Sequence, residues 1–394
     1  MLNKFPIKIL IVIFVILVAT VDIYGFGSRP PRQRKIIRVA VVRDKPEIAL
    51  TLNGCYEICA LGTDMKILSG SSLKKTIISS TVDGLKINDE DFKIYGVKIL
   101  TGKDGGIFVN GRRFRGHIEI IREADLMLLA VNHIDIEDYL FGVLQYEVSF
   151  WWPYPALEAQ AIAARTYALY QSQVNRKKDY DVTNDTFSQV YGGASKERYR
   201  TRKAVIKTQS LVLTYQGNIF PTYYHATCGG HTEDACELWN IDLPPLKGVE
   251  CGFCEKSPHY DWRSQMTIEE IEKKLTAGGY KVSQILDIVP LKRDRSKRIR
   301  ELKILYKEGS LKIGANKFRL LLGSKYIRST NFAVRVKGEN AFFKGYGWGH
   351  GVGLCQWGAY FMSKKGYKAG EILKYYYPYA EIENFFEINH AETK

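Results

Sequence analysis

The sequence lacks several features that would place it in a common functional class. It has no internal repeat, and no RNA- or DNA-binding motif accompanies its basic residues. Its most glycine-dense stretch does not end in the Gly-Lys-Ser/Thr of a phosphate-binding loop. Acidic residues number 42 against 57 basic ones, so the net charge is +15. Such a charge suits an anionic partner, but it equally suits an ordinary solvated surface, and we expect no nucleic acid as a partner.

A hydrophobic run that is short for a membrane span lies near the amino end. Lys4 and Lys8 precede the apolar stretch 9–21, which is followed by Asp22 and a turn-like segment. A basic flank, a short apolar core and a breaker describe an export signal. A membrane span needs about 20 residues, yet no clean small-residue cleavage site follows this run. We therefore expect residues 1–25 to be a cleaved signal peptide or a membrane anchor, with the remainder extracytoplasmic.

The rest of the chain predicts an α+β fold. Residues 26–36 form a basic, proline-containing linker, and short apolar runs separated by Gly, Asn and Asp predict strands in 37–130. Helices are predicted at 155–173, 196–208, 267–277, 355–365 and 369–375, and Thr267 with Glu270 forms a capping-box pattern. Strand-like runs return in 280–345. We predict a β-rich N-terminal region, a central helical catalytic segment and a C-terminal β/α region forming one groove. The expected boundaries are 37–130, a core at 131–265, a β-rich insertion at 266–340, and a C-terminal part at 341–394 that completes the core.

Four of the seven cysteines have the spacing of metal ligands. Cys228 and Cys236 form one pair, and Cys251 and Cys254 form a second pair about fifteen residues later. Two such pairs can close a tetrahedral zinc site, with His225 and His231 as alternative ligands. An exported protein equally favours two disulfides. Both alternatives are structural, whereas a zinc hydrolase would require an open coordination position. Cys355 stands alone in the sequence.

Glu147 is the first candidate for catalysis. It lies between apolar residues and is followed by Phe150, Trp151 and Trp152. An apolar setting disfavours the charged carboxylate and raises its pKa, as a general acid requires. The alternative is a half-exposed surface glutamate beside core aromatics.

Five ordered segments resemble the SpoIID/LytB family. The first segment holds Glu137-Asp138-Tyr139, Gly142-Val143, Glu147-Val148 and Trp152-Pro153, and it runs on from Ala159-Gln160-Ala161 to Arg165-Thr166-Tyr167-Ala168. The others are Gln189-Val190-Tyr191, Tyr224–Thr232, Gly345–Ala359 and Ile372–Pro378. Together they cover most of residues 115–380. Phe187 and Ser188 occupy the positions where some clostridial relatives carry zinc ligands, so that metal site does not transfer. Pro155 and Glu158 also depart from the family's usual Glu and Lys.

The resemblance implies a lytic transglycosylase that acts on peptide-stripped glycan strands of peptidoglycan. Such enzymes cut between N-acetylmuramic acid and N-acetylglucosamine and leave a 1,6-anhydro end, with no cofactor required. It implies Glu147 as acid and then base, and a site role for Arg165, for which a structural salt bridge is the alternative. The expected substrate contacts are Gln189, Tyr191, Tyr260, Trp348, His350 and Gln356. A non-catalytic modifier that enhances a wall amidase is the competing implication.

Overall fold

The computed structural model describes residues 34–63, 65–195 and 197–388. The chain divides into two units, residues 1–34 and 35–394, and the description below concerns the second. The predicted signal or anchor at 1–25 and most of the linker at 26–36 lie outside the described residues. Across the described ranges, no helix combines the length and the apolar character that crossing a membrane requires.

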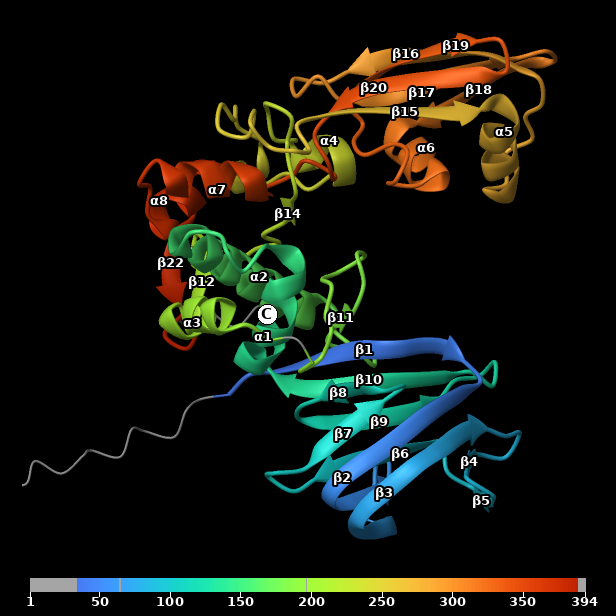
Figure 1. Ribbon diagram of the computed structural model, residues 1–394, viewed down its shortest axis with the longest axis vertical. Helices are drawn as coiled ribbons and strands as arrows, with labels where there is room; N and C mark the ends of the chain where they lie inside the picture. Colours follow the sequence, from blue (N-terminus) through green and yellow to red (C-terminus); the bar gives the residue numbers. More distant parts are fainter. Residues whose placement is uncertain (1–33, 64, 196, 389–394) are drawn as a thin grey trace, which may run out of the picture. The chain divides into compact units, whose positions relative to one another are not determined.

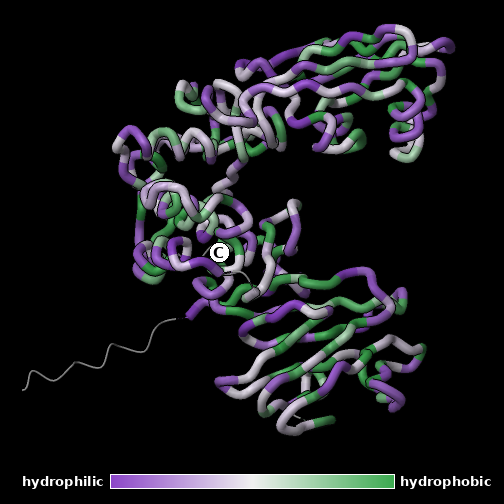
Figure 2. The backbone as a smooth tube through the Cα atoms, in the orientation of Figure 1, coloured by the Kyte–Doolittle hydropathy of each residue, from purple (hydrophilic) through white to green (hydrophobic). Residues whose placement is uncertain are grey.

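The N-terminal region is an 11-stranded sheet (Figure 1). Its main path runs β11-β1-β10-β9-β6-β2-β3-β4-β5, and β7 pairs with β2 and β8. Hydrophobic and hydrophilic residues alternate along these strands, as expected for strands with one buried face (Figure 2). The strands are β1 (Ile36–Lys45), β2 (Glu47–Ala60), β3 (Lys66–Ser80), β4 (Leu85–Ile87), β5 (Glu90–Phe92), β6 (Gly96–Thr101), β7 (Gly106–Val109), β8 (Arg112–Phe114), β9 (His117–Arg122), β10 (Leu128–Asp135) and β11 (Val182–Thr183).

Helices begin directly where this sheet ends. Strand β10 leads into α1 (Ile136–Glu147), whose N-cap Asp135 accepts a hydrogen bond from the backbone N–H of Glu137. Helix α2 (Tyr154–Val174) follows, and its alanine-rich face lets α1 and α3 (Tyr199–Lys207) pack closely against it. Gly142 lets the segment that carries Tyr191 lie against α1, because a Cβ there would lie 2.5 Å from the ring of Tyr191.

The carboxyl end of the chain returns to these helices. Strand β12 (Leu211–Tyr215) pairs with β13 (Asn218–Ile219) and with β22 (Glu381–Asn384), while β14 (Tyr224–His225) pairs in parallel with β21 (Leu354–Cys355). Helices α7 (Gln356–Lys364) and α8 (Ala369–Tyr376) pack on α2. Helix α4 (Ala235–Trp239) and the short 3-10 helix η1 (Pro244–Leu246) lie in the intervening loops.

An inserted region with its own hydrophobic core separates the two halves of this structure in sequence. It contains two three-stranded sheets and two helices (Figure 1). The sheets are β15-β20-β19 and β16-β17-β18. Their bounds are β15 (Asp261–Thr267), β16 (Ile285–Arg293), β17 (Ile299–Tyr306), β18 (Gly309–Gly314), β19 (Phe332–Lys337) and β20 (Asn340–Tyr346), with α5 (Ile268–Ala277) and α6 (Ala315–Leu322).

The predicted α+β class and the β-rich N-terminal region are confirmed. The five predicted helices are present as α2, α3, α5, α7 and α8, and Thr267 and Glu270 form both hydrogen bonds of a capping box. Helices α1, α4 and α6 were not predicted, and α4 has only five residues. Eight of the 12 residues of α1 are buried, so its sequence shows little of the apolar–polar periodicity that marks a surface helix. Helix α6 has only eight residues, too few for a clear pattern.

Candidate active site

A pocket of about 460 Å³ lies where α1 ends. Segments far apart in the sequence form its wall: the end of α1, the loop after β14, the loop before β15, and the stretch around β21. The described residues that line it are Gln145, Tyr146, Glu147, Val148, Ser149, Trp152, Ala226, His259, Trp348, Gln356 and Trp357. Among these lining residues, Glu147 is the sole carboxylate.

Glu147 is the last residue of α1 and is held by three donors. The backbone N–H of Val190 donates to its Oε1 at 3.1 Å. The side chains of Gln356 and Tyr224 also hydrogen-bond to the carboxyl group. These three donors come from three separate segments, so they fix the carboxyl group in one orientation within the pocket.

A chain of buried side chains supports this arrangement. Tyr139 donates its hydroxyl proton to Gln189 Oε1 at 3.0 Å. Gln189 Nε2 donates to the Tyr224 hydroxyl oxygen at 2.9 Å and to the carbonyl of Ala164 at 3.2 Å. With that oxygen accepting from Gln189, the Tyr224 hydroxyl proton is free to point at Glu147. Gln189 therefore orients Tyr224, which in turn orients the carboxyl group.

Burial raises the pKa of Glu147 from 4.5 to about 7, and the three hydrogen bonds only partly oppose this effect. The negative end of the α1 dipole acts in the same direction as burial, because Glu147 is at the C-terminus of the helix. Near neutral pH a large fraction of this carboxyl group is protonated. A protonated carboxylic acid in a pocket is what general-acid catalysis requires.

This pKa sets an expected pH dependence. Because the acid form is lost as the pH rises through about 7, turnover should decline above that pH. The free energy of unfolding should fall as well. The pKa of Glu147 is about 7 in the folded protein and 4.5 in the unfolded chain, so ionisation of this carboxyl group opposes folding as the pH rises from 4.5 to about 7. At pH 8, Glu147→Gln should therefore be more stable than the wild type by about 2 kcal/mol, and equally stable at pH 4. Urea unfolding at the two pH values measures this difference, and an equal difference at both would contradict the raised pKa.

Two of the six predicted substrate contacts, Trp348 and Gln356, line the pocket. Gln189 and Tyr191 do not, because both side chains are buried and bonded to protein: Tyr191 donates to Asn132 Oδ1 at 2.9 Å. Tyr260 packs on Tyr346, outside the lining.

The sixth predicted contact, His350, is also absent from the lining. Its ring packs among Tyr223, His225 and Trp239, and burial lowers its pKa to about 3. The structure thus places Gln189, Tyr191 and His350 as supports behind the pocket.

Arg165 is also a support in this structure. Its side chain is about 1% exposed and forms a bidentate ion pair with Glu137, with Nε to Oε1 at 2.9 Å and Nη2 to Oε2 at 2.6 Å. Its Nη1 donates to the carbonyl of Leu211 at 3.0 Å. These contacts join α1, α2 and β12, and they leave no guanidinium face toward the pocket. These contacts fit a structural salt bridge, the alternative to a site role for Arg165, and they hold α1 in place.

Several pocket residues were missed in the sequence. Tyr224, which hydrogen-bonds to Glu147 from outside the lining, lies inside a recognised segment, and Trp357 directly follows Gln356, yet neither was among the predicted substrate contacts. His259 neighbours Tyr260 and packs edge-on against Trp348, with ring centroids 4.7 Å apart. Gln145 lies two residues before Glu147, and both polar atoms of its side chain are buried without a partner among the described residues.

The cysteine cluster differs from the predicted set in one member. Cys228, Cys251, Cys254 and Cys355 bring their sulfur atoms within 4.8 Å of one another, and all four are buried. Cys236 lies in α4 and is not part of this group, and neither are His225 and His231. All seven cysteines lie in the described ranges, and none of them forms a disulfide there. The lone Cys355 joins the others because the parallel β14–β21 pairing brings it beside the loop that carries Cys228.

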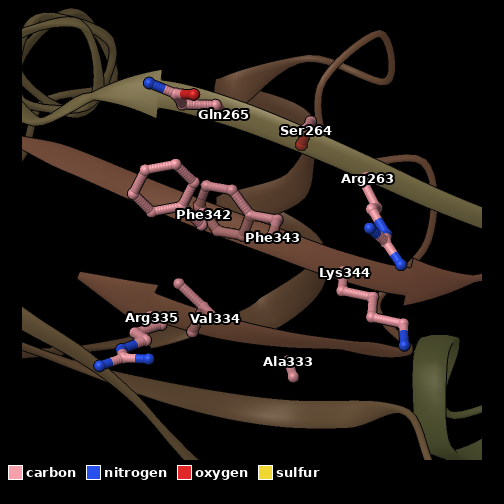
Figure 3. Close-up of a pocket in the computed structure, with 9 residues that line it drawn as sticks. All are labelled: Arg263, Ser264, Gln265, Ala333, Val334, Arg335, Phe342, Phe343 and Lys344. Carbon is pink, nitrogen blue, oxygen red and sulfur yellow. The ribbon is translucent and has the colours of Figure 1, made fainter. Parts of the chain in front are cut away.

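A larger hollow of about 550 Å³ lies on the β15-β20-β19 sheet (Figure 3). Its rim carries Arg263, Arg335 and Lys344, with the ring of Phe342 between the strands. Its lining includes the hydroxyl of Ser264, which donates to the carbonyl of Tyr326, but no carboxylate, histidine or cysteine that could act as general acid or base. Its size therefore does not make it the candidate catalytic site, and the smaller pocket at Glu147 has the required chemistry.

Comparison with known proteins identifies the family of the chain. A family model described as SpoIID, stage II sporulation protein, matches residues 125–215, and a domain of unknown function (DUF8618) matches residues 248–353. An uncharacterized protein from Brachyspira hyodysenteriae is 33% identical over 93% of this chain and 97% of its own length. The stage II sporulation protein D of Bacillus subtilis is 30% identical over 64% of this chain and 76% of its own length. The amidase enhancer of the same species is 25% identical over 76% of this chain and 49% of its own length. The ordered segments, the pocket built from them and these relatives agree, and the chain belongs to the SpoIID family.

Proposed function

We propose that this protein is a lytic transglycosylase that cleaves the glycan strands of peptidoglycan. Its membership of the SpoIID family supports the coarser assignment, a cell-wall-related role outside the cytoplasm. The observation that carries the finer assignment is a single carboxyl group with a raised pKa in a pocket without a second carboxylate.

The absence of a second carboxylate from the lining favours a lyase over a hydrolase. Glycoside hydrolases normally use two carboxyl groups, about 5 to 9.5 Å apart. The nearest candidates in the chain, Glu137 and Asp138, lie in the first turn of α1. At about 1.5 Å of rise per residue they are roughly 14 Å from Glu147 along the helix axis. The carboxylate of Glu137 is in addition paired with the guanidinium of Arg165.

A transglycosylase needs only one such group. Protonated Glu147 donates its proton to the glycosidic oxygen as the bond from C1 of N-acetylmuramic acid breaks. The resulting carboxylate then takes the proton of the C6 hydroxyl, whose oxygen bonds to C1 and closes the 1,6-anhydro ring. Water is not consumed, and Glu147 ends in its starting protonated form. This mechanism asks for no cofactor.

The other pocket residues suit a sugar chain. Trp348 and Trp357 offer faces on which pyranose rings can stack, and the edge-to-face contact of Trp357 with Trp152, with centroids 5.1 Å apart, fixes one of them. The unpartnered amide of Gln145 and Nδ1 of His259 are available to the hydroxyl and acetamido groups of a glycan. In this proposal, Gln356 holds the carboxyl group while the substrate binds beside it.

The products decide between the candidate reactions. Purified protein is incubated with peptide-stripped glycan strands, and the fragments are analysed by mass spectrometry. We expect ends lighter by one water than those from hydrolysis, which is the mark of a 1,6-anhydro ring. Fragments with ordinary reducing ends would instead show a hydrolase. Strands that bind but stay intact would support the competing role as an enhancer of a wall amidase, which the amidase enhancer relative raises. We further propose attachment or export through residues 1–25 and glycan strands as the principal partner.

A further inference from the structure

The four buried cysteines have the geometry of a mononuclear metal site. Their sulfur atoms lie within 4.8 Å of one another, and those of Cys228 and Cys254 are 3.4 Å apart. Four thiolates around one zinc at about 2.3 Å form a tetrahedron whose edges are about 3.8 Å. The observed spacing brackets that value. The four sulfur atoms are too close together for a [4Fe–4S] cluster, in which each thiolate binds a different iron and the sulfur atoms lie further apart.

Hydrogen-bond donors lie next to two of these sulfur atoms. The backbone N–H groups of Cys228 and Gly358 donate to Cys355 Sγ at 3.3 and 3.4 Å. The hydroxyl of Tyr376 lies 3.1 Å from Cys251 Sγ. Such second-layer donors stabilise thiolate ligands and fix their direction.

A four-thiolate zinc site carries two net negative charges, and a buried cation lies close by. The guanidinium of Arg298 donates through Nη2 to the carbonyl of Cys228 at 2.6 Å and through Nη1 to that of His231 at 2.9 Å. Its side chain is about 1% exposed. Arg298 thus brings positive charge to the loop that holds Cys228, and it shares that charge with Glu233, whose Oε2 lies 3.9 Å from its Nε.

The cluster also connects the segments that form the pocket wall. Cys355 directly precedes Gln356, and Cys228 follows Ala226 by two residues in the loop after β14. Cys254 precedes His259 by five residues. The backbone N–H of Trp357 donates to the carbonyl of Ala226 at 3.0 Å, so these segments already contact one another. One ion bound to all four sulfurs would hold three loops in register opposite Glu147.

We propose that Cys228, Cys251, Cys254 and Cys355 bind one structural zinc ion that fixes the pocket wall carrying Gln356 and Trp357. All four coordination positions are filled by protein, so the ion has no open position for water or substrate. It acts through positioning, and only its effect on turnover rests on the proposed function. The thiolates come from loops far apart in the chain, and the metal replaces the disulfides that an exported protein would otherwise form.

The wild-type full-length chain gives the first test. Elemental analysis should find one zinc per chain, and X-ray absorption at the zinc edge should find four sulfur neighbours at about 2.3 Å. Nitrogen or oxygen neighbours would overturn the four-cysteine set. A chain without metal, with these cysteines in disulfides, would overturn the site altogether, and so would stoichiometric iron.

Matched cysteine variants give the second test. Cys254→Ser should lose most of its zinc, whereas Cys236→Ser, a nearby cysteine outside the cluster, should keep one zinc per chain. Loss of zinc from both variants would instead indicate the set predicted from sequence spacing, in which Cys236 and Cys254 are both ligands, and zinc retained in Cys254→Ser would overturn the proposed site. Should Cys254→Ser fail to fold, the absorption spectrum of the wild type still decides the ligand set.

Amide hydrogen exchange tests the positioning role. Removal of the metal by denaturation with a chelator and refolding should speed exchange in residues 354–358 and in the loops at 226–230 and 251–259. Exchange in β2 and β3 should not change, and these strands serve as the internal reference. Unchanged exchange in all of these segments would overturn the positioning role. None of these measurements uses a glycan, so they remain interpretable if the proposed transglycosylase activity fails.

Discussion

Replacing Glu147 with glutamine is expected to lower turnover on peptide-stripped glycan strands by about three orders of magnitude. A positioned general acid contributes roughly 10²- to 10⁴-fold, and here the same group also acts as the base, so its loss removes both proton transfers. Glutamine keeps the shape of the side chain and can still accept from Val190 and Tyr224. The pocket should therefore remain intact, and strands should still bind. The rate of release of 1,6-anhydro ends measures the effect.

Glu158→Gln is the matched control. Glu158 lies in α2, and its ion pair with Lys207 at 2.8 Å is mostly exposed on the lysine side, so this change should leave turnover near the wild-type level. A Glu147→Gln protein that is folded and still turns over within tenfold of the wild type would remove Glu147 from the mechanism.

Replacing Arg165 with methionine is expected to destabilise the protein by about 3–5 kcal/mol. The change leaves the Glu137 carboxylate buried without its ionic partner, and breaking a buried ion pair from one side costs about that much. It also leaves the carbonyl of Leu211 without the donor that joins α2 to β12. The midpoint of denaturant unfolding measures the loss.

Two further variants interpret that result. Glu137→Gln added to Arg165→Met removes the unpaired charge and should recover part of the stability. Lys207→Met breaks a largely exposed ion pair and should cost less than about 1 kcal/mol. An Arg165→Met protein that is as stable as the wild type but inactive would instead return Arg165 to a direct role in the reaction.

The fold class and most helices followed from local sequence patterns, because each depends on residues close together in the chain. Helix α2 has its alanines and an early proline, and α5 has its capping box. Helix α1 has no comparable signal, since burial on most sides removes the contrast between polar and apolar faces. Its last residue is the one that matters most for the chemistry.

The site was only partly predictable, because sequence spacing does not reveal which face a side chain presents. Trp348 and Gln356 reach the pocket, whereas Gln189 and Tyr191, in another family-like segment, are buried and bonded within the protein. Cys236 has the better spacing, yet Cys355, more than 100 residues after Cys228, occupies the cluster. Only the β14–β21 pairing reveals that contact.

That same pairing governs when the pocket can exist. Strand β14 can pair with β21 only after β21 has been synthesised, some 130 residues later. Gln356 and Trp357 follow β21 directly. A chain synthesised from its amino end therefore contains Glu147 well before the opposite wall of the pocket exists. Contacts of such long sequence separation form late in folding. The wall that carries Gln356 and Trp357 is accordingly completed only after β21 has paired with β14.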